Sequence, residues 1–369
     1  MSSLAKKIVV ALSILVMAFV GTFQFGSPDW GYGVHYDEKE THAIVKRAID
    51  LGVNLFDTAE IYSSGRSEQI LGQAIAKSRD SVFLATKLWP LLPAAGLVRQ
   101  RALASARRLG VTRLDLYQAH WPNPLIGDSA IMSGMRSLQI EGIVGEVGVS
   151  SYSLRRWRAA EDALGGKILS NQVGYSLLAR SPELDLVPFA EDNGRVIIAH
   201  SPLAQGLLSG KYHRTDRSLN RVRAVNPAFY SENLDRTRDL LDVVQDVADA
   251  HRASPAQIAL AWVIRRNAVV AIPGASSVRQ VEENVAAAEI ELADEEYGAL
   301  SKASAQFCPA APGEVSVLRR LCGHLSAVRH TAKGARYLTQ TVRYDRIYSR
   351  HPHRAPRRAS YPPPARARR

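Results

Sequence analysis

The chain has 369 residues, and 46% of them are hydrophobic, which is enough for one large domain or two ordinary ones. Its net charge is +12, but residues 308–369 hold 14 of the 47 Lys and Arg residues and only 2 of the 35 Asp and Glu residues. Residues 1–307 therefore hold 33 charges of each sign, which excludes a general attraction of this part for a nucleic-acid backbone.

The first twenty residues contain a basic pair followed by a continuous apolar run. Lys6 and Lys7 precede thirteen apolar or small residues, 8–20. This pattern resembles a signal peptide, and it is too short for a membrane span of roughly 20 residues. The alternative is an apolar lead-in to a first buried strand. We expect no stable membrane insertion and a cytoplasmic protein, with export or anchoring through residues 1–20 as the alternative.

Residues 21–307 alternate short apolar runs with segments of helical period. Strands are predicted at 21–26, 53–59, 81–88, 114–121, 144–151, 168–175, 195–203 and 269–275. Helices are predicted between them at 37–52, 66–78, 97–110, 129–143, 154–165 and 183–194. Alternating strands and helices indicate a parallel sheet, and eight such units in about 290 residues favour a closed (β/α)8 TIM barrel. No GxGxxG loop follows any strand, which argues against a Rossmann fold.

Polar residues mark the carboxyl ends of the predicted strands, where barrel active sites lie. Asp57 and Lys87 end two of the strands, His120 ends a third, and Tyr62 follows Asp57 in its loop. Taken alone, each of these residues has a simpler structural explanation, such as a helix cap, an ion pair or packing. These explanations do not predict that four such residues converge at the ends of consecutive strands. The later strands end in further polar residues: Ser150, Ser151, Asn171, Gln172, His200 and Ser201.

The four residues suit acid–base chemistry on a carbonyl group. A phenol has an ordinary pKa near 10, and a neighbouring cation such as Lys87 favours its phenolate. Asp57 can pair with Lys87 and hold it in place. A phenol tuned in this way, beside His120, can protonate the oxygen of a carbonyl while a hydride arrives at its carbon.

The sequence resembles the aldo-keto reductases over residues 21–307. The runs "NLFDTAEIYSSGRSEQILGQAI", "FLATKLW" and "LDLYQAHWP" are similar to the family's segments around its catalytic Asp, Tyr, Lys and His. The resemblance implies a catalytic tetrad of Asp57, Tyr62, Lys87 and His120. "GRSE" after the tyrosine and "SPLAQGLLSGKY" resemble the branch of channel β-subunits and bacterial general reductases.

The resemblance also implies NADP(H) as the cofactor. Ser150 and Gln172 match the family's nicotinamide-binding positions, Ser151 replaces a common Asn, and His200 replaces an aromatic ring that stacks on the nicotinamide. Residues 201–211 would wrap the pyrophosphate, and residues 272–284 would hold the adenosine 2′-phosphate and adenine. The remaining cofactor-binding residues implied are Asn171, Ser201, Pro202, Leu203, Gly206, Leu208, Lys211, Gly274, Ser276, Gln280, Glu283 and Asn284.

Function is expected to be NADPH-dependent reduction of aldehydes or ketones, with Tyr62 as general acid and no metal. The alternative is a slow or non-catalytic redox-sensing subunit of the same fold. We expect Trp89 and Trp121 to line an apolar substrate pocket. The Arg-rich segment 213–236 either closes over the cofactor or is a surface excursion. Neither the physiological substrate nor the oligomeric state follows from the sequence.

The tail, residues 308–369, differs from the rest of the chain. It is rich in Arg and Pro, poor in acids, and contains both cysteines, Cys308 and Cys322, at a spacing that matches no zinc pattern. Such a composition predicts disorder. Binding of nucleic acid or an anionic membrane by this tail is the alternative, but no nucleic-acid partner is expected.

Overall fold

The computed structural model describes residues 20–90, 95–123, 127–213 and 219–309. The predictions for residues 1–19 and for the tail from residue 310 onward lie outside these ranges.

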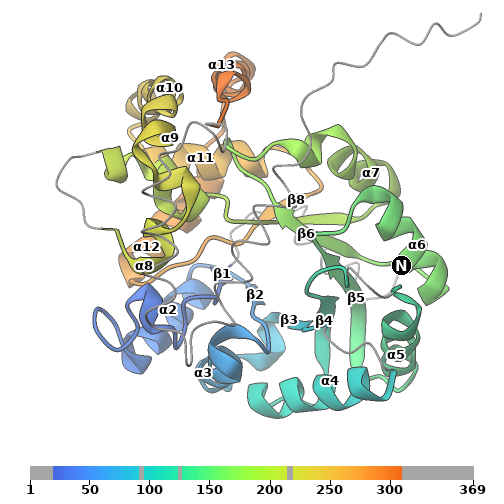
Figure 1. Ribbon diagram of the computed structural model, residues 1–369. Helices are drawn as coiled ribbons and strands as arrows, with labels where there is room; N and C mark the ends of the chain where they lie inside the picture. Colours follow the sequence, from blue (N-terminus) through green and yellow to red (C-terminus); the bar gives the residue numbers. More distant parts are fainter. Residues whose placement is uncertain (1–19, 91–94, 124–126, 214–218, 310–369) are drawn as a thin grey trace, which may run out of the picture. The chain divides into compact units, whose positions relative to one another are not determined.

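Eight parallel strands form one sheet in the order β1 to β8 (Figure 1). An isolated bridge between Gly21 and Gly274 joins the two ends of the strand order, so the sheet closes into the (β/α)8 barrel that the sequence predicts. The strands are β1 (Val20–Gly21), β2 (Leu55–Asp57), β3 (Phe83–Leu88), β4 (Leu114–Ala119), β5 (Val144–Ser150), β6 (Ser170–Gly174), β7 (Val196–His200) and β8 (Val269–Ala271).

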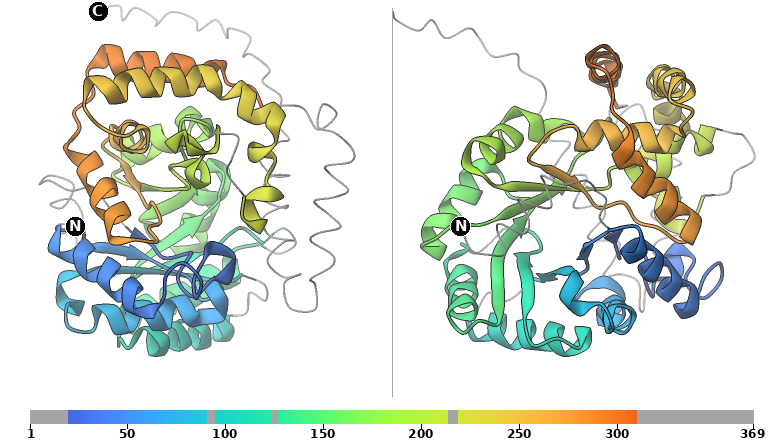
Figure 2. Two further views of the ribbon diagram at one scale, coloured as in Figure 1. Left: turned by 90° about the vertical axis from the view of Figure 1, so that its left-hand side faces the viewer. Right: turned by 180° about the vertical axis from the view of Figure 1, so that it is seen from behind.

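Helices lie outside the strands all round the sheet (Figure 2). Those that follow β1 to β6 are α2 (Glu38–Asp50), α3 (Arg66–Ile75), α4 (Ala95–Leu109), α5 (Ser129–Ile140), α6 (Leu154–Leu164) and α7 (Leu186–Asn193). Those after β7 and β8 are α8 (Arg221–Ala224), α9 (Ser231–Arg236), α10 (Arg238–Ala250), α11 (Pro255–Ile264), α12 (Val278–Ala286) and α13 (Asp294–Gln306). Short 3-10 turns include η2 (Tyr62–Gly65) and η5 (Ala204–Ser209).

Local signals in the sequence start and stop these helices. Asp37 and Glu40 form a reciprocal capping box at the start of α2, which satisfies two backbone N–H groups. Gly165 and Gly194 end α6 and α7 with φ values of 67° and 57°, in the left-handed region that costs glycine little.

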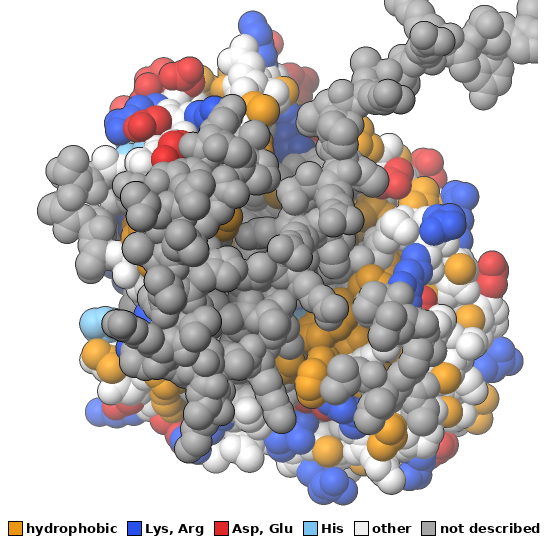
Figure 3. Space-filling model, in the orientation of Figure 1, with side chains coloured by type: hydrophobic (Ala, Val, Ile, Leu, Met, Phe, Trp, Pro, Cys, Tyr) orange, Lys and Arg blue, Asp and Glu red, His pale blue; other side chains and the backbone are white. Residues whose placement is uncertain are grey.

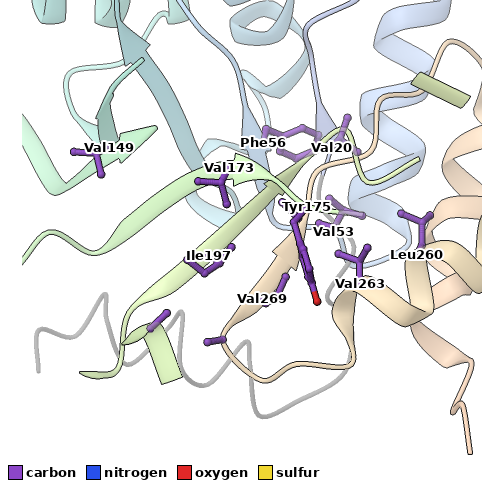
Figure 4. Packing of buried hydrophobic residues seen from close by; sticks show 14 of the residues in the cluster. Val20, Val53, Phe56, Val149, Val173, Tyr175, Ile197, Leu260, Val263 and Val269 are labelled. Atoms are coloured by element: carbon purple, nitrogen blue, oxygen red, sulfur yellow. The ribbon is translucent and has the colours of Figure 1, made fainter. Parts of the chain in front are cut away.

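Alternation along each strand separates two apolar layers. One set of side chains faces the helices and forms the larger core (Figure 4). Its nearly or fully buried members include Phe56, Val149, Val173, Ile197 and Val269. The other set lies inside the barrel, where a second cluster includes Leu55, Ala85, Leu116, Ile198 and Val270. The interior positions that follow on the same strands, toward the carboxyl ends, carry the polar residues of the site.

The predicted first strand, 21–26, is wrong in its extent. The strand consists of Val20 and Gly21, which pair with Phe56 and Asp57. A turn follows, closed by a 3.0 Å hydrogen bond from Phe25 N to Thr22 O, and Gly26 has a φ of 74°. Phe25 is thereby buried in the outer core, whereas Phe23 remains 40% exposed.

Side chains of both charge signs are interspersed around the periphery of the face seen in Figure 3. This distribution agrees with the balanced charge of residues 1–307. Within the ranges that the structure describes, no helix is both long and apolar enough to cross a membrane.

Candidate active site

A buried ion pair joins the ends of two neighbouring strands. Asp57 ends β2 and Lys87 lies in β3, and both side chains are almost completely removed from water. Lys87 Nζ donates to Asp57 Oδ1 in a short, charge-assisted hydrogen bond. Burial lowers the pKa of Lys87, and the charge of Asp57 opposes that change.

Lys87 has three N–H donors, and each has an acceptor. Besides Asp57, it donates to Thr58 O at 2.9 Å and to Tyr62 Oη at 3.2 Å. Tyr62 begins η2, five residues after Asp57, and its side chain is only 9% exposed. The phenol oxygen thus accepts a hydrogen bond from the third and last N–H donor of the Lys87 ammonium.

His120 follows β4 and lies beside the tyrosine. Its ring centroid is 5.5 Å from that of Tyr62, and its Nδ1 is buried without a hydrogen-bond partner in the described residues. Burial lowers the pKa of His120 well below its ordinary value, and the positive charge of Lys87 acts in the same direction. The imidazole is therefore neutral at physiological pH. The structure brings all four side chains predicted for the tetrad together.

Two glutamines, one of them not predicted, complete the surroundings of Asp57. Gln172 Nε2 in β6 donates to Asp57 Oδ2 at 2.9 Å, and Gln118 Nε2 in β4 donates to the same oxygen at 3.2 Å. Sequence reasoning missed Gln118. It precedes His120 by two positions, and strand parity places it on the same inward face.

An aromatic wall stands beside Tyr62. Phe23, from the turn after β1, packs edge-on against Tyr62 at 5.0 Å and against Trp30 at 5.7 Å. Trp121 contacts the His120 ring, with centroids 4.6 Å apart. Trp89 lies beside Arg101, whose guanidinium carbon is 5.6 Å from the indole ring. Phe23 was missed because the turn was taken for a strand.

The residues assigned to the nicotinamide lie at the ends of β5, β6 and β7. Ser150 Oγ donates to Gln172 O at 2.9 Å, and Ser151 has a left-handed backbone with φ of 61°. The Asn171 side chain is engaged with the backbone of Tyr152 through both its oxygen and its nitrogen. These two bonds tie β6 to the loop after β5. The cofactor-binding role of Asn171 stays a prediction.

His200 ends β7 and lies over a glycine. A side chain at Gly174 would approach the His200 ring to 3.3 Å, so the ring would have to shift by a few tenths of an ångström to make room for it. Burial lowers the pKa of His200 to about 4, and the Lys87 charge contributes in the same direction. A neutral imidazole ring thus lies at the position predicted to face the nicotinamide.

The loop after β7 contains several left-handed residues. Ser201, Ala204, Gln205 and Gly206 have φ values of 53°, 47°, 56° and 94°. Backbones of this kind can turn successive N–H groups toward one side and form a concave anion site. The predicted pyrophosphate residues Pro202, Leu203, Leu208 and Lys211 lie in or beside this loop.

The residues predicted for the adenosine end gather at the start of α12. Ser277 caps this helix, and Gln280 Oε1 accepts hydrogen bonds from Ser276 N at 2.7 Å and Ser276 Oγ at 3.1 Å. Glu283 pairs with Arg279 at 2.8 Å on the exposed side of the helix. Gly274 and Asn284 lie before and within the same helix. A helix start of this kind favours a phosphate group.

The Arg-rich segment 213–236 packs onto the β7 loop where the structure describes it. Arg223 Nε donates to Gln205 O at 2.9 Å, and its guanidinium carbon lies 4.8 Å from the Trp30 ring and 5.1 Å from the Tyr212 ring. Arg223 therefore links the turn after β1 with the loop after β7.

Comparisons with known proteins point to one family. The model of the Aldo/keto reductase family matches residues 19–305. An uncharacterized oxidoreductase of Mycobacterium tuberculosis is 52% identical over 294 residues, covering 80% of this chain and 91% of its own. An NADH-specific methylglyoxal reductase of Escherichia coli is 31% identical over 74% of this chain and 90% of its own. A crystal structure of an aldo-keto reductase from Klebsiella pneumoniae in complex with NADPH has a TM-score of 0.63 and a sequence identity of 28%. The match covers 78% of this chain and 90% of that one.

Proposed function

The chain belongs to the aldo/keto reductase family, and we propose that it is an NADPH-dependent reductase that converts aldehydes or ketones to alcohols. In this proposal Tyr62 is the proton donor, and Lys87, Asp57 and His120 are the groups that assist it. The observation that carries the proposal is the buried hydrogen bond of 3.2 Å from Lys87 Nζ to Tyr62 Oη.

Proton transfer from Tyr62 to the substrate oxygen is the step that this arrangement favours. The oxygen of a carbonyl gains negative charge as its carbon accepts a hydride, and a neighbouring phenol can then supply the proton. The ammonium of Lys87 stabilises negative charge on the phenol oxygen, so the proton leaves more readily. Asp57 balances the lysine charge, which keeps the buried site close to neutral overall.

His120 orients the substrate in this proposal. Its neutral ring can donate one N–H hydrogen bond to the carbonyl oxygen, while the phenol of Tyr62 donates another. Two donors converging on one oxygen fix its position and stabilise its developing charge. Because the pKa of His120 is lowered, the ring does not compete with Tyr62 as an acid near neutral pH.

The residues at the ends of β5 to β8 fit a nicotinamide dinucleotide. Gln172 uses its Nε2 on Asp57, and its Oε1 accepts no hydrogen bond within the described residues, so this oxygen can accept from a carboxamide NH₂. The left-handed loop after β7 and the start of α12 offer N–H groups for the phosphates. NADPH supplies the hydride when it is bound.

The choice of NADPH over NADH depends on the start of α12. Ser276, Arg279 and Gln280 offer a hydroxyl, a guanidinium and an amide for a 2′-phosphate, and Arg279 is itself paired with Glu283. The Klebsiella protein was crystallised with NADPH, whereas the Escherichia coli relative is named for NADH. Arg279 favours the phosphorylated nucleotide because a charge-assisted hydrogen bond contributes about 1.5–3 kcal/mol.

The substrate is a carbonyl compound with an apolar or aromatic body. Phe23 and Trp121 flank Tyr62 and His120, so apolar surface adjoins the proposed acid. Small 2-oxoaldehydes are also candidates, because one relative is a methylglyoxal reductase.

The proposal is tested with the purified protein in two steps. NADPH and NADH are titrated by nicotinamide fluorescence, and NADPH oxidation is then followed with methylglyoxal, benzaldehyde and an aliphatic ketone. Saturable, substrate-dependent oxidation supports the proposal. Tight NADPH binding with no turnover on any carbonyl would instead favour a redox-sensing subunit.

A further inference from the structure

A row of interior positions crosses four strands, starting at Lys87 of the tetrad. In the strand register Lys87 is level with Gln118, Gln118 with Gly148, and Gly148 with Ser170. The row starts at the proposed catalytic lysine and is polar wherever it carries a side chain. Gln118 is fully buried within it, although a glutamine is rarely buried in a protein core.

Gly148 leaves the room that Gln118 and Ser170 need. A methyl group at Gly148 would lie 2.5 Å from Ser170 Oγ and 2.8 Å from Gln118 Cγ, which is closer than atoms can approach. Ser170 Oγ donates to Gln118 Oε1 at 3.4 Å across this gap. Because Gly148 on β5 has no side chain, Ser170 on β6 can reach Gln118 on β4 and hydrogen-bond its amide.

The chemistry of Asp57 fixes which way the Gln118 amide faces. An ionised carboxylate only accepts hydrogen bonds, so the group of Gln118 that faces it is the NH₂, and the oxygen faces the Ser170 hydroxyl. Asp57 then has a donor for each oxygen: Lys87 for Oδ1, and Gln118 with Gln172 for Oδ2. Because the Asp57 side chain is almost completely buried, these donors define where the carboxylate lies.

We propose that Gln118 is a positioning residue of this active site, which holds Asp57 through its side-chain amide and so keeps Lys87 in place beside Tyr62. This inference rests on the proposed function only for its effect on turnover. Gln172 is also proposed to bind the cofactor, whereas the Gln118 side chain hydrogen-bonds only Asp57 and Ser170 among the described residues.

Loss of the Gln118 amide should alter the proton affinity of Tyr62. An N–H dipole directed at the site favours negative charge there, and a well-placed Lys87 stabilises the Tyr62 phenolate. Removing the amide weakens both effects, so Tyr62 should hold its proton to higher pH. The titratable groups of the described chain that act on this pair include Lys87, Glu68, whose charge acts on Lys87, and His120, whose ring lies beside Tyr62. All of them are unchanged in the variant.

The test compares Gln118→Met, which keeps the length of the side chain but has no N–H, with Gln73→Met on the outer helix α3 as the matched control. Tyrosines are labelled with ¹³C at Cζ, and the Tyr62 signal, assigned with Tyr62→Phe, is followed by NMR between pH 6 and 11. We expect the Tyr62 titration in Gln118→Met to move up by about half a unit and to stay unchanged in the control. The kcat for carbonyl reduction should fall about 3–10-fold, with the Kd for NADPH unchanged.

Ser170→Ala provides a second variant in case Gln118→Met does not fold. It removes only the hydroxyl that holds the Gln118 amide, so the Tyr62 titration should move in the same direction by a smaller amount. An unchanged Tyr62 titration in a folded Gln118→Met protein would overturn the inference. If the titration shifts but the wild-type protein reduces no carbonyl, the positioning role stands and the proposed function fails.

Discussion

Gln172 Nε2 donates a 2.9 Å hydrogen bond to Asp57 Oδ2, so the residue expected to hold the cofactor's carboxamide also holds the counter-ion of the proposed catalytic lysine. Since Nε2 of this amide already donates to Asp57, only Oε1 remains to accept a hydrogen bond from the carboxamide NH₂ of a nicotinamide. Binding of the cofactor at Gln172 would therefore fix the orientation of the amide and strengthen its contact with Asp57. One side chain would thus join the proposed cofactor site to the counter-ion of the proposed catalytic lysine.

The buried pair of Asp57 and Lys87 should be costly to break from one side only. Asp57→Asn leaves an unpaired ammonium and Lys87→Met an unpaired carboxylate, and each should lower the free energy of unfolding by about 3–5 kcal/mol. The double variant should lose less than the sum of the two single losses, because it leaves no unpaired charge. Urea unfolding of the four proteins measures this coupling, and additive losses would contradict a direct pair.

Cofactor preference should depend on the start of α12. We expect the wild-type protein to bind NADPH at least about tenfold more tightly than NADH, since one charge-assisted hydrogen bond contributes about 1.5–3 kcal/mol. Arg279→Ala should weaken NADPH binding and leave NADH binding nearly unchanged. Fluorescence titration gives all four dissociation constants. Equal constants for the two nucleotides in the wild-type protein would show that α12 does not read the 2′-phosphate.

His200 should make the fold less stable in mild acid. Its pKa is lowered to about 4 in the folded chain, against about 6.5 for an ordinary imidazole. Between these values the unfolded state binds more protons, so stability falls as pH drops from 6.5 to 4, by at most about 1.4 kcal/mol per pH unit. His200→Phe should flatten this part of the profile in melting experiments. A profile of the same slope in His200→Phe would assign the effect to His120 or to other groups.

The tail should be dispensable for the reductase. α13 ends at Gln306, and Arg236 hydrogen-bonds the carbonyl oxygen of Cys308 at 3.1 Å, so a chain that ends at Pro309 keeps this contact. We propose that this shortened chain folds with the wild-type melting temperature and binds NADPH equally well. A shortened chain that melts earlier or loses NADPH affinity would show that residues 310–369 contribute to the barrel or its site.

The alternating pattern predicted seven of the eight strands because each is a short, largely apolar run between turn or helix signals. The first failed for a physical reason: "GTFQFG" alternates like a strand, but Phe25 reaches the outer core through a turn, and only Val20 and Gly21 pair with β2. The site residues at strand ends could be predicted because the barrel directs them to one edge. Gln118 could not, since a glutamine in a strand has no chemical signature until the register with Gly148 and Ser170 is known.

Turnover of Tyr62→Phe tests the central claim most directly. The phenol oxygen accepts from Lys87 and donates the proton in the proposed reaction, whereas the ring keeps its packing against Phe23. The measurement is NADPH oxidation with saturating aldehyde, alongside NADPH affinity, for the wild type, Tyr62→Phe and, as the matched control, Tyr297→Phe on the outer helix α13. We predict that Tyr62→Phe loses about 10²–10⁴ in kcat with an unchanged Kd for NADPH, and that Tyr297→Phe retains activity. A Tyr62→Phe protein that keeps most of its turnover would contradict the assignment of Tyr62 as the proton donor.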